Sequence, residues 1–135
     1  MRLDHIGIAV RNLDEAVKFY RDVLGLELVR VEEVPEERVR IAMFRAGEVY
    51  IELLQGTDPE SAVSKFIERR GEGIHHIALH VDDVEAKTEE LRSRGVAVLY
   101  EKPREVSHGE RRINFIHPKS AYGVLLEILT RRVGR

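Results

Sequence analysis

The sequence contains an internal repeat. Residues 4–10 read Asp-His-Ile-Gly-Ile-Ala-Val, and residues 75–81, which begin 71 positions later, read His-His-Ile-Ala-Leu-His-Val. Each copy alternates apolar residues as a strand does, and an expected helix that ends at Gly25 or Gly95 follows it. Because such self-similarity means that one supersecondary unit is used twice, the two halves of the chain are expected to fold alike.

Three strand-like segments follow each of these helices. They are residues 26–33, 38–46 and 49–55 in the first half and residues 96–101, 111–117 and 123–130 in the second. A third helix is expected between the halves, with Asp58 as its N-cap, Pro59 in its first turn and its end near Gly71. Asn12 and Asp83 are expected to cap the other two helices.

This layout predicts an α+β fold with two tandem βαβββ modules in a single domain. The modules are expected at residues 1–56 and 73–131, with a linking helix at residues 57–72, and the basic end at residues 131–135 is expected to fray. A chain of 135 residues can bury one substantial core but is too short for two independent domains.

Composition excludes several classes of partner and site. With 22 Lys and Arg against 24 Asp and Glu, the chain lacks the positive charge of a nucleic-acid-binding protein. The absence of Cys excludes disulfides and thiolate metal ligands. No apolar segment reaches the ~18 residues of a membrane span and no signal-peptide pattern precedes the first strand, so a cytoplasmic protein is expected. High charge with few Asn and Gln is typical of a thermophilic source.

The first strand of each half carries a histidine on a face that is otherwise made of small residues. Because side chains alternate along a strand, His5 shares its face with Gly7 and Ala9. His76 likewise shares its face with Ala78, and with His80 further along. Small neighbours leave space beside each histidine, and a ligand pocket needs such space.

The last strand of each half carries one glutamate among apolar residues. Glu52 and Glu127 occupy corresponding positions in the repeat. A buried carboxylate without a partner costs several kcal/mol or takes up a proton, so each glutamate needs a cation, a donor or a functional reason. Two glutamates at equivalent places point to one shared reason.

A divalent metal held by His5, Glu52, His76 and Glu127 supplies that reason. Two imidazoles and two carboxylates suit cobalt, manganese, zinc, nickel or iron at an octahedral centre that leaves two positions for water or substrate. An ordinary core or surface role would explain any one of the four alone, but chance does not place four residues at matched positions of a repeat.

Other polar residues are weaker candidates. His80 and His117 are the better of the remaining histidines for a contact with substrate, whereas His75 is expected on the opposite face of its strand. Gln55 could replace a ligand but is expected on the wrong face relative to Glu52.

Two βαβββ modules with His and Glu on their first and last strands resemble the vicinal oxygen chelate (glyoxalase-like) superfamily, whose curved sheets form one metal-binding cleft. Within it, the chain looks most like the methylmalonyl-CoA epimerase family, and the resemblance runs nearly end to end. The segments that carry it are residues 3–10, 71–78 and 95–100, and above all Arg-Ile-Asn-Phe-Ile-His-Pro-Lys-Ser at 112–120 with Gly-Val-Leu-Leu-Glu at 123–127.

The resemblance implies a site and a reaction. Its ligands would be His5, Glu52, His76 and Glu127, and relatives often have Gln at the place of Glu52. It favours cobalt, with manganese, zinc, nickel or magnesium possible. It implies that methylmalonyl-CoA is converted between its (R) and (S) forms at C2, by 1,1-proton transfer through a metal-stabilised enolate, as a step of propionate metabolism. It also implies a homodimer.

The second acid/base group, the residues that contact the CoA phosphates and the function itself each have alternatives. Glu127 is the candidate for one acid/base group, but Ile41 stands where some relatives have a second Glu. Glu52, a metal-bound water or His80 could take that role, or a single base could serve both faces. The CoA phosphates could be contacted by any of four cations: Arg111, Arg112, Lys102 and Lys119. The alternative functions are a glyoxalase-type isomerase and a metal-free small-molecule binding protein of the same fold.

Overall fold

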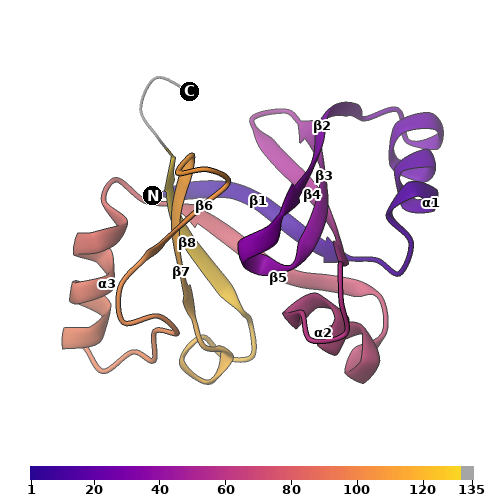
Figure 1. The fold of residues 1–135 in the computed structure, drawn as a ribbon. Helices are drawn as coiled ribbons and strands as arrows, with labels where there is room; N and C mark the ends of the chain where they lie inside the picture. The colour runs from indigo at the N-terminus through magenta and orange to yellow at the C-terminus, as the bar shows by residue number, and fades with distance from the viewer. Residues whose placement is uncertain (132–135) are drawn as a thin grey trace. The chain divides into compact units, whose positions relative to one another are not determined.

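The computed structural model describes residues 1–131 and divides into two compact units (Figure 1). Unit 2 is His5–His75, and unit 1 joins Met1–Asp4 to the chain from His76 onward. Strand β1 (Arg2–Ala9) therefore begins in unit 1 and continues into unit 2, and β5 (Gly73–His80) begins in unit 2 and continues into unit 1. The predicted module boundaries at residues 56/57 and 72/73 stay a prediction.

Unit 2 contains a sheet with the strand order β2-β3-β4-β1. Its strands β2 (Glu27–Val34), β3 (Val39–Ala46) and β4 (Val49–Gly56) begin and end within one residue of the three predicted segments. β1 pairs with β4 in parallel, and the other pairs are antiparallel. One face of the sheet packs against the first helix in a core of Val10, Leu13, Val17, Ala42, Phe44 and Leu53.

The first helix begins at the predicted residue. Asn12 accepts a hydrogen bond from the Glu15 backbone N–H at 3.1 Å, and α1 (Leu13–Val17) follows. From Lys18 to Val23 the helix widens into the π-helix η1, where the Leu24 N–H bonds to the Phe19 carbonyl five residues earlier. The expected helix is thus confirmed, while its change of form after one turn was not expected.

The linking helix α2 (Ala62–Arg70) begins later than predicted, and Asp58 as its cap is wrong. Ser61 is the N-cap, since its Oγ accepts a hydrogen bond from the Ser64 N–H at 3.0 Å. Asp58 accepts instead from the Glu60 N–H at 2.7 Å, so its side chain closes a turn before the helix. The predicted end at Gly71, in the left-handed region at φ 79°, is confirmed.

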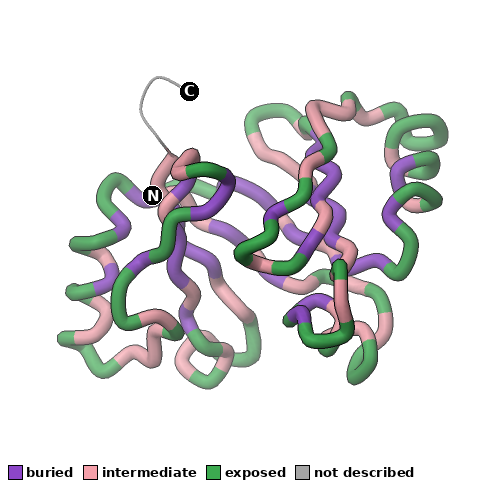
Figure 2. Tube along the Cα trace, viewed as in Figure 1, coloured by how far each residue is buried: buried purple, intermediate pink, exposed green. Residues whose placement is uncertain are grey.

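Unit 1 repeats the layout of unit 2, with the strand order β5-β8-β7-β6. Helix α3 (Val84–Ser93) begins at the predicted cap Asp83, and Figure 2 shows buried and exposed residues alternating along it. Its strands are β6 (Arg104–Val106), β7 (Arg111–Ile116) and β8 (Leu126–Arg131). β5 pairs with β8 in parallel, as β1 pairs with β4. The α+β fold with a duplicated strand order is therefore confirmed.

The strand predicted at residues 96–101 is wrong. Only Val98 forms a bridge there, to Ile116, with backbone hydrogen bonds from the Leu99 N–H to the Phe115 carbonyl and from the His117 N–H to the Ala97 carbonyl. The first strand after α3 is the short β6. The amide of Asn114 explains why the pairing ends at Tyr100, because it accepts from the Tyr100 N–H and donates to the Tyr100 carbonyl, each at 3.1 Å. The prediction for residues 123–130 begins too early, since Gly123 at φ 95° still belongs to the preceding turn.

Two further predictions concern membrane-spanning segments and the basic C-terminal end. Among residues 1–131, no helix is long and apolar enough to cross a membrane. The expected fraying of the basic end concerns residues 132–135, which lie outside the described residues, and Arg131, which ends β8 in an ion pair with Asp4.

Candidate metal centre

Each unit contains one buried histidine beside one buried glutamate. In unit 2, His5 Nε2 lies 3.5 Å from Glu52 Oε1, and the two residues are 0% and 1% exposed. In unit 1, His76 Nε2 lies 3.1 Å from Glu127 Oε1, and these residues are 6% and 3% exposed. The structure thus places the four predicted ligands in two equivalent pairs.

The same strand register builds both pairs. Gly7 is the direct partner of Glu52 in the parallel pair β1/β4, and Ala78 is the direct partner of Glu127 in the pair β5/β8. In each unit the histidine lies two residues before that small partner, so it shares the face of the sheet with the glutamate. A small residue directly beside the carboxylate leaves room for the imidazole to approach it.

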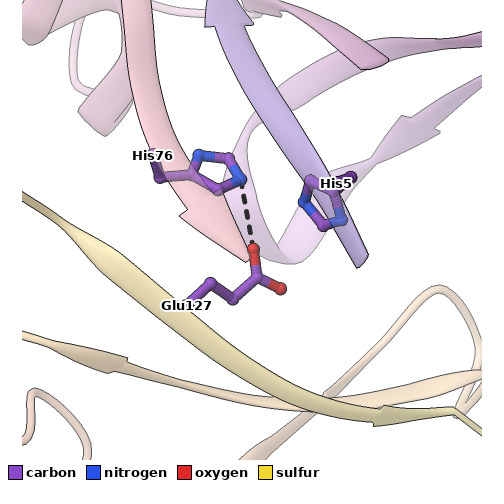
Figure 3. A group of neighbouring side chains, drawn as sticks. All are labelled: His5, His76 and Glu127. Atoms are coloured by element: carbon purple, nitrogen blue, oxygen red, sulfur yellow. Dashed lines mark ion pairs between the residues drawn. The ribbon is translucent and has the colours of Figure 1, made fainter. Parts of the chain in front are cut away.

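Three of these side chains form a group suited to a metal ion. His5, His76 and Glu127 are all buried and each offers one ligand atom, and these atoms lie within 4.8 Å of one another (Figure 3). In Figure 3 the His76 imidazole points at the Glu127 carboxylate. Imidazole and carboxylate donors suit a divalent first-row metal.

The fourth predicted ligand carries an observation that fits a cation. Glu52 Oε2 is buried and has no hydrogen-bond partner among residues 1–131, while Oε1 lies 3.5 Å from His5 Nε2. A buried carboxylate oxygen without a partner costs about 1–3 kcal/mol or more. A divalent cation beside it would remove this cost, so the residues present fit a metal site.

The remaining histidines have different surroundings. His80 lies on the same face of β5 as His76, is half-buried, and has a pKa lowered by burial and by the positive charge of Arg2. His117 Nδ1 accepts a hydrogen bond from the Lys119 N–H at 3.0 Å and caps a short turn. The ring of His75 packs against Phe66, with centroids 5.1 Å apart, as a residue of the opposite face does.

Gln55 lies on the face of the sheet opposite Glu52, as predicted. Its Oε1 accepts a hydrogen bond from the Leu13 N–H at 2.7 Å and so holds the start of α1. Gln55 is the third residue after Glu52 on β4, so its side chain leaves the opposite face of the sheet.

Ile41 lies in the buried apolar core. Ile41 is 5% exposed and cannot transfer a proton. Its direct cross-strand partner on β2 is Glu32. Met43, which lies two residues further along β3 and on the same face, pairs with Glu52 on β4. The Glu32 side chain is 24% exposed and lies 3.5 Å from Arg30 Nε. Glu32 was not among the residues predicted from the sequence. Only its position on the strand, between Val31 and Glu33, could have indicated the face on which it lies.

The four cations considered for CoA phosphates are not equivalent. Arg112 is bound by the carboxylates of Glu85 and Glu105. Lys102 and Lys119 are exposed, and Arg111 is buried at 5% exposure. Only Arg111 among them combines burial with an unused donor, because its Nε has no hydrogen-bond partner within residues 1–131.

Comparison with known proteins identifies the family. Residues 4–115 match the model of the glyoxalase/bleomycin resistance protein/dioxygenase superfamily. The chain belongs to this superfamily. The superfamily resemblance expected from the repeat and from its His and Glu positions is thereby confirmed, and the His/His/Glu group is consistent with a divalent metal in such a protein.

Three proteins illustrate the similarity. An uncharacterized protein of Bacillus subtilis, YqjC, is 39% identical over 127 residues, which are 94% of this chain and 90% of YqjC. The mitochondrial methylmalonyl-CoA epimerase of Mus musculus is 34% identical over 128 residues, or 94% of this chain and 71% of the mouse protein. A solved structure of a Streptomyces coelicolor methylmalonyl-CoA epimerase variant with 2-nitronate-propionyl-CoA has a TM-score of 0.93 at 43% identity, covering 98% of this chain and 96% of that one. The chain is thus a superfamily member related to methylmalonyl-CoA epimerases.

Proposed function

We propose that the protein is a metal-dependent methylmalonyl-CoA epimerase that interconverts the (R) and (S) forms at C2. The observation that carries the proposal is the duplicated buried His–Glu pair, built by the same register in both units. The relationship to epimerases, one of which binds an acyl-CoA analogue, supports the choice of substrate.

His5, Glu52, His76 and Glu127 would hold the metal. A divalent cation there would supply positive charge that stabilises the negative charge developing on the substrate as C2 loses its proton. Burial of all four side chains strengthens such an electrostatic effect, because the site is shielded from water.

Glu127 would be the acid/base group on one side of C2. Its carboxylate is buried in unit 1, with one oxygen beside His76. An acid/base group must lie within hydrogen-bond reach of the proton that it moves. The neighbouring Ala78 leaves a substrate atom room to approach, since Ala78 pairs directly with Glu127.

A second acid/base group is needed if the proton returns on the opposite face of a planar intermediate. Ile41 cannot serve. Three groups with suitable chemistry are Glu32, Glu52 and His80. Variants Glu32→Gln, Glu52→Gln and His80→Asn should separate them, because loss of one base slows deuterium exchange from one epimer more than from the other.

The test of the proposed function is exchange at C2. One epimer of methylmalonyl-CoA is incubated in deuterated water with metal-loaded protein, and both epimer ratio and label are followed by NMR. Racemisation with deuterium at C2, lost on chelation and restored by metal, is expected. A folded, metal-loaded protein that incorporates no deuterium at C2 would contradict the proposal. Turnover of a glutathione hemithioacetal would favour a glyoxalase-type isomerase instead.

Metal identity and assembly belong to the same proposal. Cobalt is the first metal to test, by elemental analysis after dialysis and by reconstitution with manganese, zinc and nickel as comparisons. Absence of stoichiometric metal after each reconstitution would favour a metal-free binding protein. A homodimer is proposed as the assembly and would be checked by sedimentation.

A further inference from the structure

Arg111, the first residue of β7, is a buried cation with unused hydrogen-bonding capacity. Its Nη2 donates to Ser107 Oγ at 3.2 Å, and Nε has no hydrogen-bond partner among residues 1–131. The residue is only 5% exposed. Because a charge removed from water is costly unless it is paired, buried arginines normally bind a carboxylate or several acceptors. Within the described residues Arg111 binds one neutral hydroxyl, and it therefore has capacity for an anion.

Arg111 lies on the face of the unit 1 sheet that carries Glu127. In the β7/β8 register Phe115 pairs with Glu127 and Arg111 pairs with Arg131, and these positions share one face because they are separated by even numbers of residues. The rings of Phe115 and His76 lie 6.2 Å apart, which places His76 on the same side. Along the strand, the four positions from Phe115 to Arg111 span about 13 Å.

The cross-strand partner of Arg111 is another arginine, which binds a carboxylate of its own. Arg131, across from Arg111, donates to both oxygens of Asp4, with Nη2–Oδ2 at 2.7 Å and Nε–Oδ1 at 3.1 Å. Strand pairing thus brings Arg111 beside an arginine rather than beside a carboxylate. A guanidinium in such surroundings attracts an anionic ligand.

The loop before Arg111 positions Ser107, whose hydroxyl accepts from Arg111. Ser107 and His108 adopt φ of 54° and 58°, in the left-handed region that side chains rarely occupy. Each such residue costs on the order of 1–2 kcal/mol. The resulting turn buries Ser107, at 6% exposure, with its hydroxyl against Arg111.

We propose that Arg111, oriented by Ser107, binds an anionic group of the acyl-CoA substrate. This inference rests on the proposed function for the identity of the ligand. A guanidinium binds a carboxylate or a phosphate through two parallel hydrogen bonds, so the acyl carboxylate and the CoA phosphates share the required chemistry.

Calorimetry on metal-free protein separates the two sources. The ligands are methylmalonyl-CoA, propionyl-CoA, which lacks the free carboxylate, and CoA itself. Arg111→Met is expected to weaken binding about 10- to 100-fold, as the loss of a charged hydrogen bond does. Arg112→Met is the matched control, because Arg112 is already bound by Glu85 and Glu105, and should leave binding within about threefold. Weakening for all three ligands identifies a phosphate, and weakening for methylmalonyl-CoA alone identifies the carboxylate.

Thermal unfolding distinguishes a binding role from a structural one. Removal of an uncompensated buried charge should leave the Tm of Arg111→Met unchanged or raise it. Arg111→Lys keeps the charge and should bind more tightly than Arg111→Met. A lowered Tm with unchanged binding, or unchanged binding of all three ligands, would overturn the inference. Wild-type binding without exchange at C2 would instead reject the epimerase proposal and leave the Arg111 site standing.

Discussion

His76 and Glu127 lie on neighbouring parallel strands, with Nε2 3.1 Å from Oε1, and both residues are buried. His5 and Glu52 repeat this relationship in the other unit at 3.5 Å. The register explains the match, because each histidine lies two residues before the small partner of its glutamate. Each half of the repeat thus contributes one imidazole and one carboxylate.

Glu127→Gln should abolish epimerisation. The amide keeps the size of the carboxylate but cannot accept the C2 proton, and a general base contributes roughly 10²- to 10⁴-fold to a rate. Exchange at C2, measured with metal content, checks this. Glu33→Gln, which changes an exposed carboxylate on β2, is the matched control and should retain both metal and activity. Equal activity of Glu127→Gln and wild type would contradict the role of Glu127.

Removal of the metal should lower the stability of the fold. A ligand that binds only the folded state stabilises it by about 2.7 kcal/mol at 100 times its Kd. Thermal melts with chelator, with cobalt and with magnesium should therefore show a higher Tm for whichever ion fills the site. The variant with alanine at both His5 and His76 should lose this ion dependence, and a Tm that rises equally in that variant would indicate binding elsewhere.

Asn114→Ala should be strongly destabilising. The Asn114 side chain is fully buried and bonds to Thr88 Oγ1, to both backbone groups of Tyr100 and to the Phe115 N–H. Groups left buried without partners cost about 1–3 kcal/mol each, so a loss of about 2–4 kcal/mol is expected. Urea unfolding measures it. A cost below about 1 kcal/mol would show that water replaces the amide.

Gly56→Ala should also destabilise the protein, for a steric reason. A Cβ at position 56 would lie 2.0 Å from Ser64 Oγ and 2.3 Å from Ser61 Oγ, the hydroxyl that caps α2. Overpacking of this kind costs about 1–3 kcal/mol. The double variant Gly56→Ala, Ser64→Ala should recover part of the lost stability. A Gly56→Ala variant as stable as wild type would mean that the start of α2 shifts to accommodate the methyl group at no cost.

Stability should fall in acid partly because of His80. Burial lowers the pKa of His80 in the folded protein below the ordinary value of about 6.5 that applies when the chain unfolds. The unfolded state therefore binds more protons below pH about 6.5, so this contribution destabilises the fold as pH falls below that value and is absent above it. His80→Asn should lose less stability than wild type between about pH 7 and pH 5 in urea unfolding. Parallel curves would contradict the shift.

The sequence was sufficient to predict the matched His–Glu pairs His5/Glu52 and His76/Glu127, since alternation and the repeat together place a histidine and a glutamate on one face in each half. It was insufficient wherever a side chain competes with the backbone. Asn114 binds the backbone of Tyr100 and so ends the pairing within residues 96–101, and Ser61 rather than Asp58 caps α2. Both outcomes depend on contacts that propensity does not contain.

The burial of Arg111 could not be predicted from the sequence either. A basic residue at the start of a strand is ordinarily solvated, and only the turn at Ser107 and the register with Arg131 show that it is covered. Glu32 became a candidate in the same way, through its pairing with Ile41. Residues that act through cross-strand neighbours need the register, and a single sequence gives it weakly.

The ion pair between Asp4 and Arg131 connects residues 127 positions apart and lies wholly within unit 1. A gene fragment encoding only the second copy of the repeat would therefore lack Asp4, the carboxylate that Arg131 binds. Because Met1–Asp4 begin the first copy of the repeat but belong to unit 1, we expect separately expressed halves to be insoluble alone and to recover structure when mixed.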